Sequence, residues 1–226
     1  LVFQDPQAAL NPVRTVGGQL AEVLRAHRGL GPRDIGREVE AALLRVGLPD
    51  PSRQALAYPH ELSGGMRQRA AIAIALAGGP SVLLADEPTT ALDATVQAQV
   101  LELLKRLSRE EGLSVLLVTH DLLVAAHVAD RIAVMYAGRV VEEGPARAVL
   151  ASPSHPYTIG LMGSRPADPK APLSPIPGQV PRPGNWPEGC PFHLRCVRVE
   201  ERCRTEVQAP VPLGAGRWAA CWKAGS

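Results

Sequence analysis

The segment SVLLADEPTTALDA, residues 81 to 94, decides the fold class. Its first five residues form a continuous apolar run, which is typical of a strand buried in a parallel sheet. A second run of this kind, SVLLV, lies at residues 114 to 118. Between the two runs, one helical face carries a set of apolar residues and ends at Gly112: Val96, Val100, Leu103, Leu104 and Leu107. We therefore predict a βαβ unit over residues 81 to 118 and an α/β fold.

Upstream of this unit, LSGGMRQR at residues 62 to 69 places a serine and two glycines before an alanine-rich run. This pattern is typical of a helix N-terminus that can bind an anion, because the first backbone N–H groups of a helix have no partner within it. We predict a helix from about Met66 to Ala77. Two earlier helices are predicted from Asn11-Pro12 and from Pro32-Arg33-Asp34, with these apolar faces: Val16, Leu20, Val23, Leu24; and Ile35, Val39, Leu43, Val46. Residues 48 to 61 are predicted to be loop.

Acidic and polar residues follow both predicted strands, where ligands of parallel sheets usually bind. Asp86 and Glu87 end the first strand, and Thr119-His120-Asp121 ends the second. Such a pair suits Mg²⁺-dependent nucleotide chemistry, in which Asp86 holds the metal through water and Glu87 orients or deprotonates the attacking water. Each feature alone also has a simpler interpretation, since an acidic pair can cap a turn and a lone histidine is more often structural.

The composition is that of an ordinary globular protein of 226 residues, with 46% apolar and 20% charged residues. The net charge of +2 gives no argument for a nucleic-acid partner. The longest purely apolar run, Ala70 to Ala77, is far shorter than the roughly 18 residues that a membrane span needs. The chain opens at Leu1 inside the apolar run LVF, and we expect it to be a fragment that starts within a strand.

The C-terminal third has a different character. RIAVMY, Ala137-Gly138 and RVVEEG predict a hairpin, and ten prolines then fall between Ser152 and Cys190. We therefore predict three parts: a first domain over 1–150 with a helical subdomain at about 11–78, a proline-rich arm over 151–189, and a small cysteine-rich module over 190–226.

The chain contains four motifs: LVFQDP, LSGGMRQR, SVLLADEPTTALDA and LLVTHD. Their order and spacing are those of the nucleotide-binding domain of ABC transporters. Residues 1 to about 145 therefore resemble that domain. The resemblance implies part of a P-loop-NTPase-like domain, with a helical subdomain and a parallel-sheet core. It also implies these roles: Gln4 as the Q-loop glutamine, Ser63, Gly64 and Gly65 as the signature, Asp86 as the Walker B aspartate, Glu87 as the catalytic glutamate, Asp93 as the D-loop aspartate and His120 as the switch histidine.

In that family ATP lies between two domains, so the signature of one chain closes on ATP held by the Walker A loop of the other. The chain contains no G-x-x-x-x-G-K-[ST] loop and no Gly-Lys pair. We therefore expect the complete family member to be an ATPase using ATP and Mg²⁺, the latter near Asp86 and Gln4. The chain alone is expected to be inactive.

The segment SPSHPYTIGLMGSRP, residues 152 to 166, resembles the C-terminal extension of oligopeptide and dipeptide importer ATPases. This resemblance implies a peripheral subunit at the cytoplasmic face of the cell membrane. Its expected partners are a second ABC ATPase subunit, two transmembrane permease subunits and, indirectly, an extracytoplasmic substrate-binding protein, with no nucleic acid. Two alternatives are an ABC-type ATPase acting on DNA, although no long heptad repeat is present, and a non-catalytic regulatory or redox-sensing fragment.

The four cysteines, spaced C-x5-C-x6-C-x17-C, all lie in the tail: Cys190, Cys196, Cys203 and Cys221. Disulfides are the simplest interpretation, but thiols stay reduced in a cytoplasmic ATPase. Four soft thiolates suit zinc or an iron–sulfur cluster. The resemblance to peptide importers implies a [4Fe-4S] cluster, with zinc as the alternative.

Overall fold

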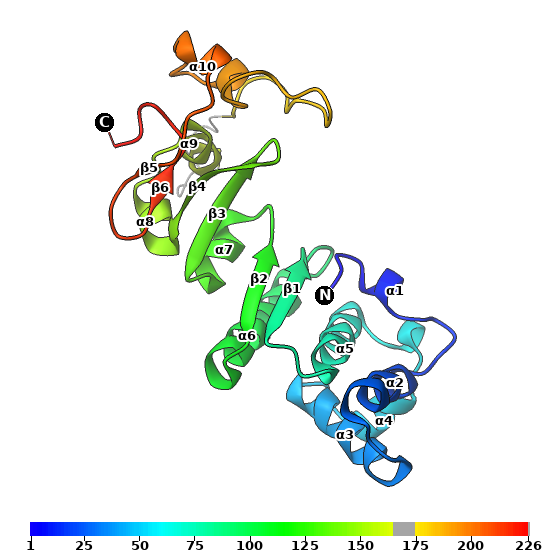
Figure 1. The fold of residues 1–226 in the computed structure, drawn as a ribbon. Coiled ribbons are helices and arrows are strands. Elements are labelled where there is room, and N and C mark those ends of the chain that lie inside the picture. The colour runs from blue at the N-terminus through cyan, green and yellow to red at the C-terminus, as the bar shows by residue number, and fades with distance from the viewer. Residues whose placement is uncertain (165–174, 226) are drawn as a thin grey trace. The chain divides into compact units, whose positions relative to one another are not determined.

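The structure is a computed structural model that describes residues 1–164 and 175–225. It consists of two compact units, residues 1–124 and 125–226 (Figure 1). No helix in the described ranges combines the length and the apolar character that a membrane crossing requires.

Helices form the first part of unit 1: α1 (Pro6–Ala9), α2 (Val16–Arg28), α3 (Pro32–Arg45), α4 (Pro51–Leu56), the 3-10 turn η1 (Pro59–Glu61) and α5 (Gly64–Ala77). The α2 helix begins later than predicted, because the hydroxyl of Thr15 caps it by accepting from the N–H of Gly18. It ends at Gly29, which has a φ of 63°. The loop prediction for residues 48 to 61 is wrong in part, since Asp50 caps a short helix there.

The predicted helical faces are confirmed as the core of unit 1. Leu20 and Leu24 of α2 and Leu43 of α3 are almost completely buried, and they share one apolar cluster with α5. Val23, by contrast, is only partly buried and packs against the edge of this cluster.

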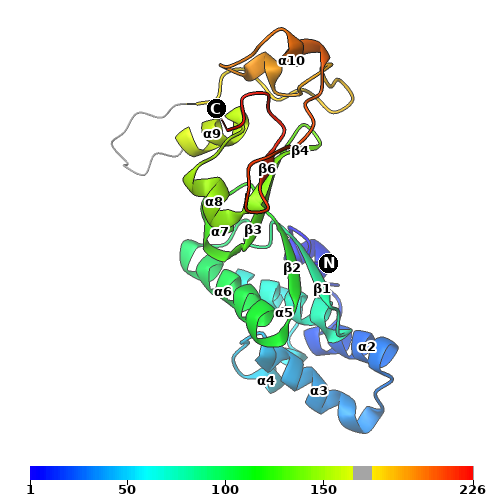
Figure 2. The same cartoon turned by 60° about the vertical axis from the view of Figure 1, so that its left-hand side comes forward.

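A parallel sheet follows the helices. Strands β1 (Val82–Asp86) and β2 (Ser114–Val118) pair in parallel, and α6 (Ala94–Glu111) connects them, as predicted (Figures 1 and 2). The start of the chain adds a short third segment, because the N–H of Val2 donates to the carbonyl of Leu84 at 2.7 Å and the carbonyl of Val2 accepts from Asp86 at 3.0 Å.

The prediction that both strands are fully buried is wrong. In β1, Leu83 is 0% exposed whereas its neighbours Val82 and Leu84 are 52% and 43% exposed. Leu116 and Val118 of β2 are exposed in the same way. One face therefore packs into the helical core, and the other has no cover from the described residues. A continuous apolar run carries no periodicity, so the sequence could not reveal this asymmetry.

Unit 2 is built on the predicted hairpin, β3 (Arg131–Tyr136) and β4 (Arg139–Pro145), which has a bulge between Val134 and Met135. The remaining elements are α7 (Leu122–Val128, at the boundary between the units), α8 (Ala146–Ala151), α9 (Pro156–Gly163), the 3-10 turn η2 (His193–Arg195), α10 (Arg202–Thr205), β5 (Val211–Pro212) and β6 (Trp218–Ala219). The sheet order is β3-β4-β6-β5.

Two findings modify the predicted tail. The proline-rich segment contains a helix, α9, because Pro156 occupies its first turn, where the missing N–H costs nothing. The cysteine-rich segment does not form a core of its own, since Phe192, Cys190 and Cys196 pack with the hairpin. Residues 165–174 of the predicted arm lie outside the described residues.

Candidate functional site

Three polar side chains from separate segments converge on Glu87, which directly follows β1. The Nε2 of Gln4 donates to Oε2 at 3.0 Å. The Nδ1 of His120 lies 2.9 Å from Oε1, and the hydroxyl of Thr90 donates to Oε2 at 2.8 Å. Glu87 and His120 were predicted as site residues from the ends of strands, and Gln4 from the resemblance to ABC transporters, whereas Thr90 was not predicted.

The parallel ladder explains this convergence. The backbone N–H of Glu87 donates to the carbonyl of Val118 at 2.9 Å, which places the residues after β1 and β2 at the same edge. Val2 pairs with β1 on its other side and brings Gln4 to that edge. The φ of Glu87 is 42°, a conformation that non-glycine residues rarely adopt and that is often found at functional sites.

The hydrogen bonds also determine the charge of this group. The contact with His120, followed by that with Thr90, lowers the pKa of the Glu87 carboxyl below its ordinary value. The carboxyl is therefore ionised at neutral pH and can only accept hydrogen bonds. His120 is 70% exposed in its side chain and Glu87 is 23% exposed, so a ligand from outside can reach both.

Asp86 is the last residue of β1 and is exposed. Asp93 caps α6, and its carboxylate accepts from the N–H groups of Thr95 and Val96 at 3.1 Å and 3.0 Å. A structural role for Asp93 is thus present whether or not it also contacts nucleotide.

The predicted signature lies at the start of α5. Ser63 is the N-cap, and its hydroxyl accepts from the N–H of Met66 at 3.3 Å. A Cβ on Gly65 would lie 2.3 Å from Cγ1 of Val96, so packing between α5 and α6 already requires glycine there. A Cβ on Gly64 would meet only Cδ2 of Leu92 at 3.5 Å, an ordinary contact.

The four cysteines line one small cavity in unit 2 and are free thiols: Cys190, Cys196, Cys203 and Cys221. Burial raises the pKa values of Cys190, Cys196 and Cys221, and the neighbouring thiols raise them further. Two atoms of the lining residues, Oε1 of Gln208 and Nε1 of Trp222, are buried without a hydrogen-bond partner in the part of the chain that the structure describes.

The side chains of the described residues do not form a complete metal site. Within the described ranges, no group of three or more His, Cys, Asp or Glu side chains is arranged to hold one. The predicted convergence of the four cysteines on a metal centre and the predicted magnesium ligands, Asp86 and Gln4, therefore remain predictions.

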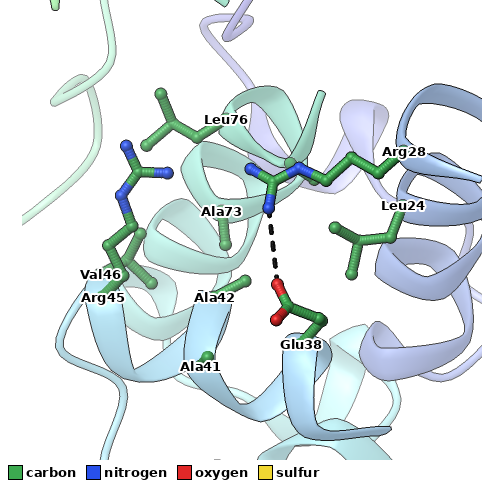
Figure 3. Close-up of a pocket in the computed structure, with 10 residues that line it drawn as sticks. Leu24, Arg28, Glu38, Ala41, Ala42, Arg45, Val46, Ala73 and Leu76 are labelled. Carbon is green, nitrogen blue, oxygen red and sulfur yellow. Dashed lines mark hydrogen bonds and ion pairs between the residues drawn. The ribbon is translucent and has the colours of Figure 1, made fainter. Parts of the chain in front are cut away.

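A second cavity, of about 120 Å³, lies among α2, α3 and α5 (Figure 3). Its wall is mostly aliphatic, and Arg28 and Glu38 form an ion pair at 3.4 Å. Arg45, which also lines it, is paired with Glu111. The cavity thus offers aliphatic surface, and its charged side chains, Arg28, Glu38 and Arg45, are each held in an ion pair.

Sequence reasoning also missed a buried ion pair in unit 2. Glu142 is 0% exposed, and it accepts from Nη2 of Arg217 at 2.8 Å and from the N–H of His155 at 2.9 Å. The N–H of Ser154 also donates to this carboxylate. The pair ties β4 to the His-Pro-Tyr segment and to the tail.

Two family models match parts of the chain. Residues 1–90 match the family model described as ABC transporter, and residues 141–203 match the one described as oligopeptide/dipeptide transporter, C-terminal region. A putative peptide import ATP-binding protein of Brucella ovis is 51% identical over 215 residues, which are 92% of this chain and 64% of that protein. The dipeptide transport ATP-binding protein DppD of Escherichia coli is 46% identical over 224 residues, which are 98% of this chain and 68% of that protein.

A solved ATP-binding cassette is also similar to this chain. The dimeric ATP-binding cassette MJ0796, in a post-hydrolysis state bound to ADP and Pi, is similar with a TM-score of 0.55 and 36% identity. The similarity covers 65% of this chain and 62% of that one. The chain thus spans about two thirds of the length of the proteins it matches.

Proposed function

The chain belongs to the ABC transporter ATP-binding proteins, and we propose that it is part of the ATP-hydrolysing subunit of a peptide importer of the oligopeptide/dipeptide type. The observation that carries the proposal is the hydrogen-bonded cluster of Gln4, Thr90 and His120 around the ionised carboxylate of Glu87. The match of residues 141–203 to the oligopeptide/dipeptide C-terminal region supports the substrate class.

In this proposal Glu87 is the general base, because its carboxylate is ionised, accessible and held in one orientation. His120 contacts the γ-phosphate. Ser63, Gly64 and Gly65 close on ATP held by a second ABC ATPase subunit, presenting the positive start of α5 to the phosphate. Asp93 lies at the same interface, as the resemblance implies.

The residues present suit Mg²⁺. Asp86 is an exposed carboxylate at the strand end, and the amide nitrogen of Gln4 is engaged by Glu87, which leaves its oxygen as the ligand atom. Few protein ligands are expected, since Mg²⁺ usually keeps several waters. When bound, the ion neutralises charge on the phosphates.

The proposed partners are a second ATPase subunit and two transmembrane permeases at the cytoplasmic face of the membrane, with an extracytoplasmic binding protein acting indirectly. The DppD relative is named a dipeptide transport protein, which supports this assembly. The proposed parts of the chain are the ABC domain over 1–150, the arm over 151–189 and the cysteine-rich segment over 190–226.

A steady-state ATPase measurement tests the proposal. It compares the chain alone with the completed ATPase, by which we mean this chain preceded by a segment that carries a Walker A loop. The chain alone should not hydrolyse ATP, because nothing in its sequence provides the phosphate-binding loop and lysine. The completed ATPase should hydrolyse it. Steady hydrolysis by the chain alone, or none by the completed ATPase, would contradict the proposal.

We further propose that the cysteine cavity binds a thiolate-held cofactor, a [4Fe-4S] cluster with zinc as the alternative. Four soft donors line one cavity, and the buried indole N–H of Trp222, which has no hydrogen-bond partner among the described residues, suits a sulfide acceptor. Among the described residues, these side chains do not form a metal-ligand arrangement. Anaerobic purification followed by iron and zinc analysis tests the idea. Metal-free protein with four titratable thiols would refute it.

A further inference from the structure

Thr90 contacts Glu87 through two separate groups. Its backbone N–H donates to the carbonyl of Glu87 at 3.1 Å, which closes a tight turn. Its hydroxyl donates to Oε2 of the same residue at 2.8 Å. Because Thr90 is itself exposed, its side chain contributes little to the core. The main contact of its hydroxyl is therefore the hydrogen bond that orients Glu87.

The donors around Glu87 are divided unequally between its two oxygens. Oε2 accepts from Thr90 and from Gln4, whereas the only donor to Oε1 within the described residues is His120. An ionised carboxylate has about four acceptor positions, two on each oxygen. Oε2 is thus saturated, and Oε1 keeps one position for a further donor.

We propose that Thr90 is a positioning residue for ATP hydrolysis: with Gln4 it saturates Oε2 and so assigns Oε1, beside His120, to the attacking water. The inference rests on the proposed function. In the step that it serves, the water oxygen forms a new bond to the γ-phosphorus and the water proton passes to Oε1. The bond between the γ-phosphorus and the bridging oxygen breaks, and its electron pair leaves with ADP.

The backbone of Glu87 makes such support necessary. Its φ of 42° is held by the N–H contact with Val118 and by the turn to Thr90. The carboxylate extends from this backbone on a side chain with several rotatable bonds, so hydrogen bonds are needed to hold it in one orientation. Without the hydroxyl, the turn would remain while the carboxylate could rotate away from Gln4 and His120.

Three variants of the completed ATPase test the proposal. Thr90→Val keeps the shape and the backbone N–H but removes the hydroxyl, and we expect kcat to fall about tenfold while KM for ATP changes less than about twofold. Thr90→Ser retains the hydroxyl and should restore kcat. Thr205→Val makes the same change at an exposed threonine in unit 2 and should leave both constants unchanged. An undiminished kcat in Thr90→Val, a loss confined to KM, or failure of serine to restore kcat would overturn the role of Thr90.

A crystal structure of Thr90→Val separates this inference from the proposed function. We expect its Glu87 carboxylate to leave the contacts with Gln4 and His120. An unmoved carboxylate would refute the positioning role even if the unsubstituted ATPase proved inactive. Inactivity of that unsubstituted protein would instead refute the proposed function.

Discussion

Arg217→Met should destabilise unit 2 strongly, because it leaves the carboxylate of Glu142 buried without its cation. Glu142 is 0% exposed, and the side chain of Arg217 is only 11% exposed. Breaking a buried ion pair by removing one partner costs about 3–5 kcal/mol. The N–H groups of Ser154 and His155 still solvate the carboxylate, so we expect a loss near the lower end, about 3 kcal/mol.

The assay follows from the positions of the tryptophans. All three, Trp186, Trp218 and Trp222, lie in unit 2, so intrinsic fluorescence during urea unfolding reports on that unit. A loss of about 3 kcal/mol would shift the urea midpoint by more than about 1 M.

A matched control makes the same substitution at an exposed ion pair. Arg204 contacts Glu201 at 3.4 Å with side chains 51% and 91% exposed, so Arg204→Met should change stability by less than about 1 kcal/mol. Substituting both Glu142 and Arg217 by methionine should recover part of the loss, since no unpaired charge is then buried. Equal effects of Arg217→Met and Arg204→Met would refute the reasoning.

Three further predictions concern the site and the fold. In the completed ATPase, Glu87→Gln should retain ATP binding and nearly abolish hydrolysis, because an amide cannot take the proton from water; an unchanged turnover number would show that another group is the base. Gly65→Ala should destabilise unit 1 by about 1–3 kcal/mol in circular dichroism melts because its Cβ would clash with Val96, whereas Gly64→Ala should not; similar losses in both would contradict the packing argument. Burial lowers the pKa of His155 to about 4, partly opposed by Glu142, so the unfolded chain binds more protons between pH 4 and 6.5. Unit 2 should therefore lose stability as the pH falls through this window, and His155→Asn should lose less.

The helices whose apolar residues recur with helical periodicity could be predicted from the sequence. Leu20 and Leu24, four residues apart, had to share a helical face, and both are buried. The chemistry at the strand ends was predictable for a similar reason, since parallel strands end at one edge and so bring Glu87 and His120 together.

Partners that are distant in sequence could not be predicted. Glu142 lies in a run that looks solvent-exposed, and the cation that allows its burial, Arg217, is 75 residues away. Strands β5 and β6 have two residues each, too few for any pattern. Thr90 is near Glu87 in sequence, but the hydrogen bond between them depends on the positive φ of Glu87, which its residue type does not predict.

The exposed face of the parallel sheet connects the fold to the proposed chemistry. Six apolar side chains from three adjacent segments lie on it: Leu1, Phe3, Val82, Leu84, Leu116 and Val118. Parallel sheets are normally covered on both faces, and this face ends at the edge that carries Asp86 and Glu87. A segment that covers it would therefore pass beside the carboxylates. In the completed ATPase, we expect the added segment to cover this face and to bring its phosphate-binding loop to Glu87, so that burial of the sheet and completion of the proposed site occur together.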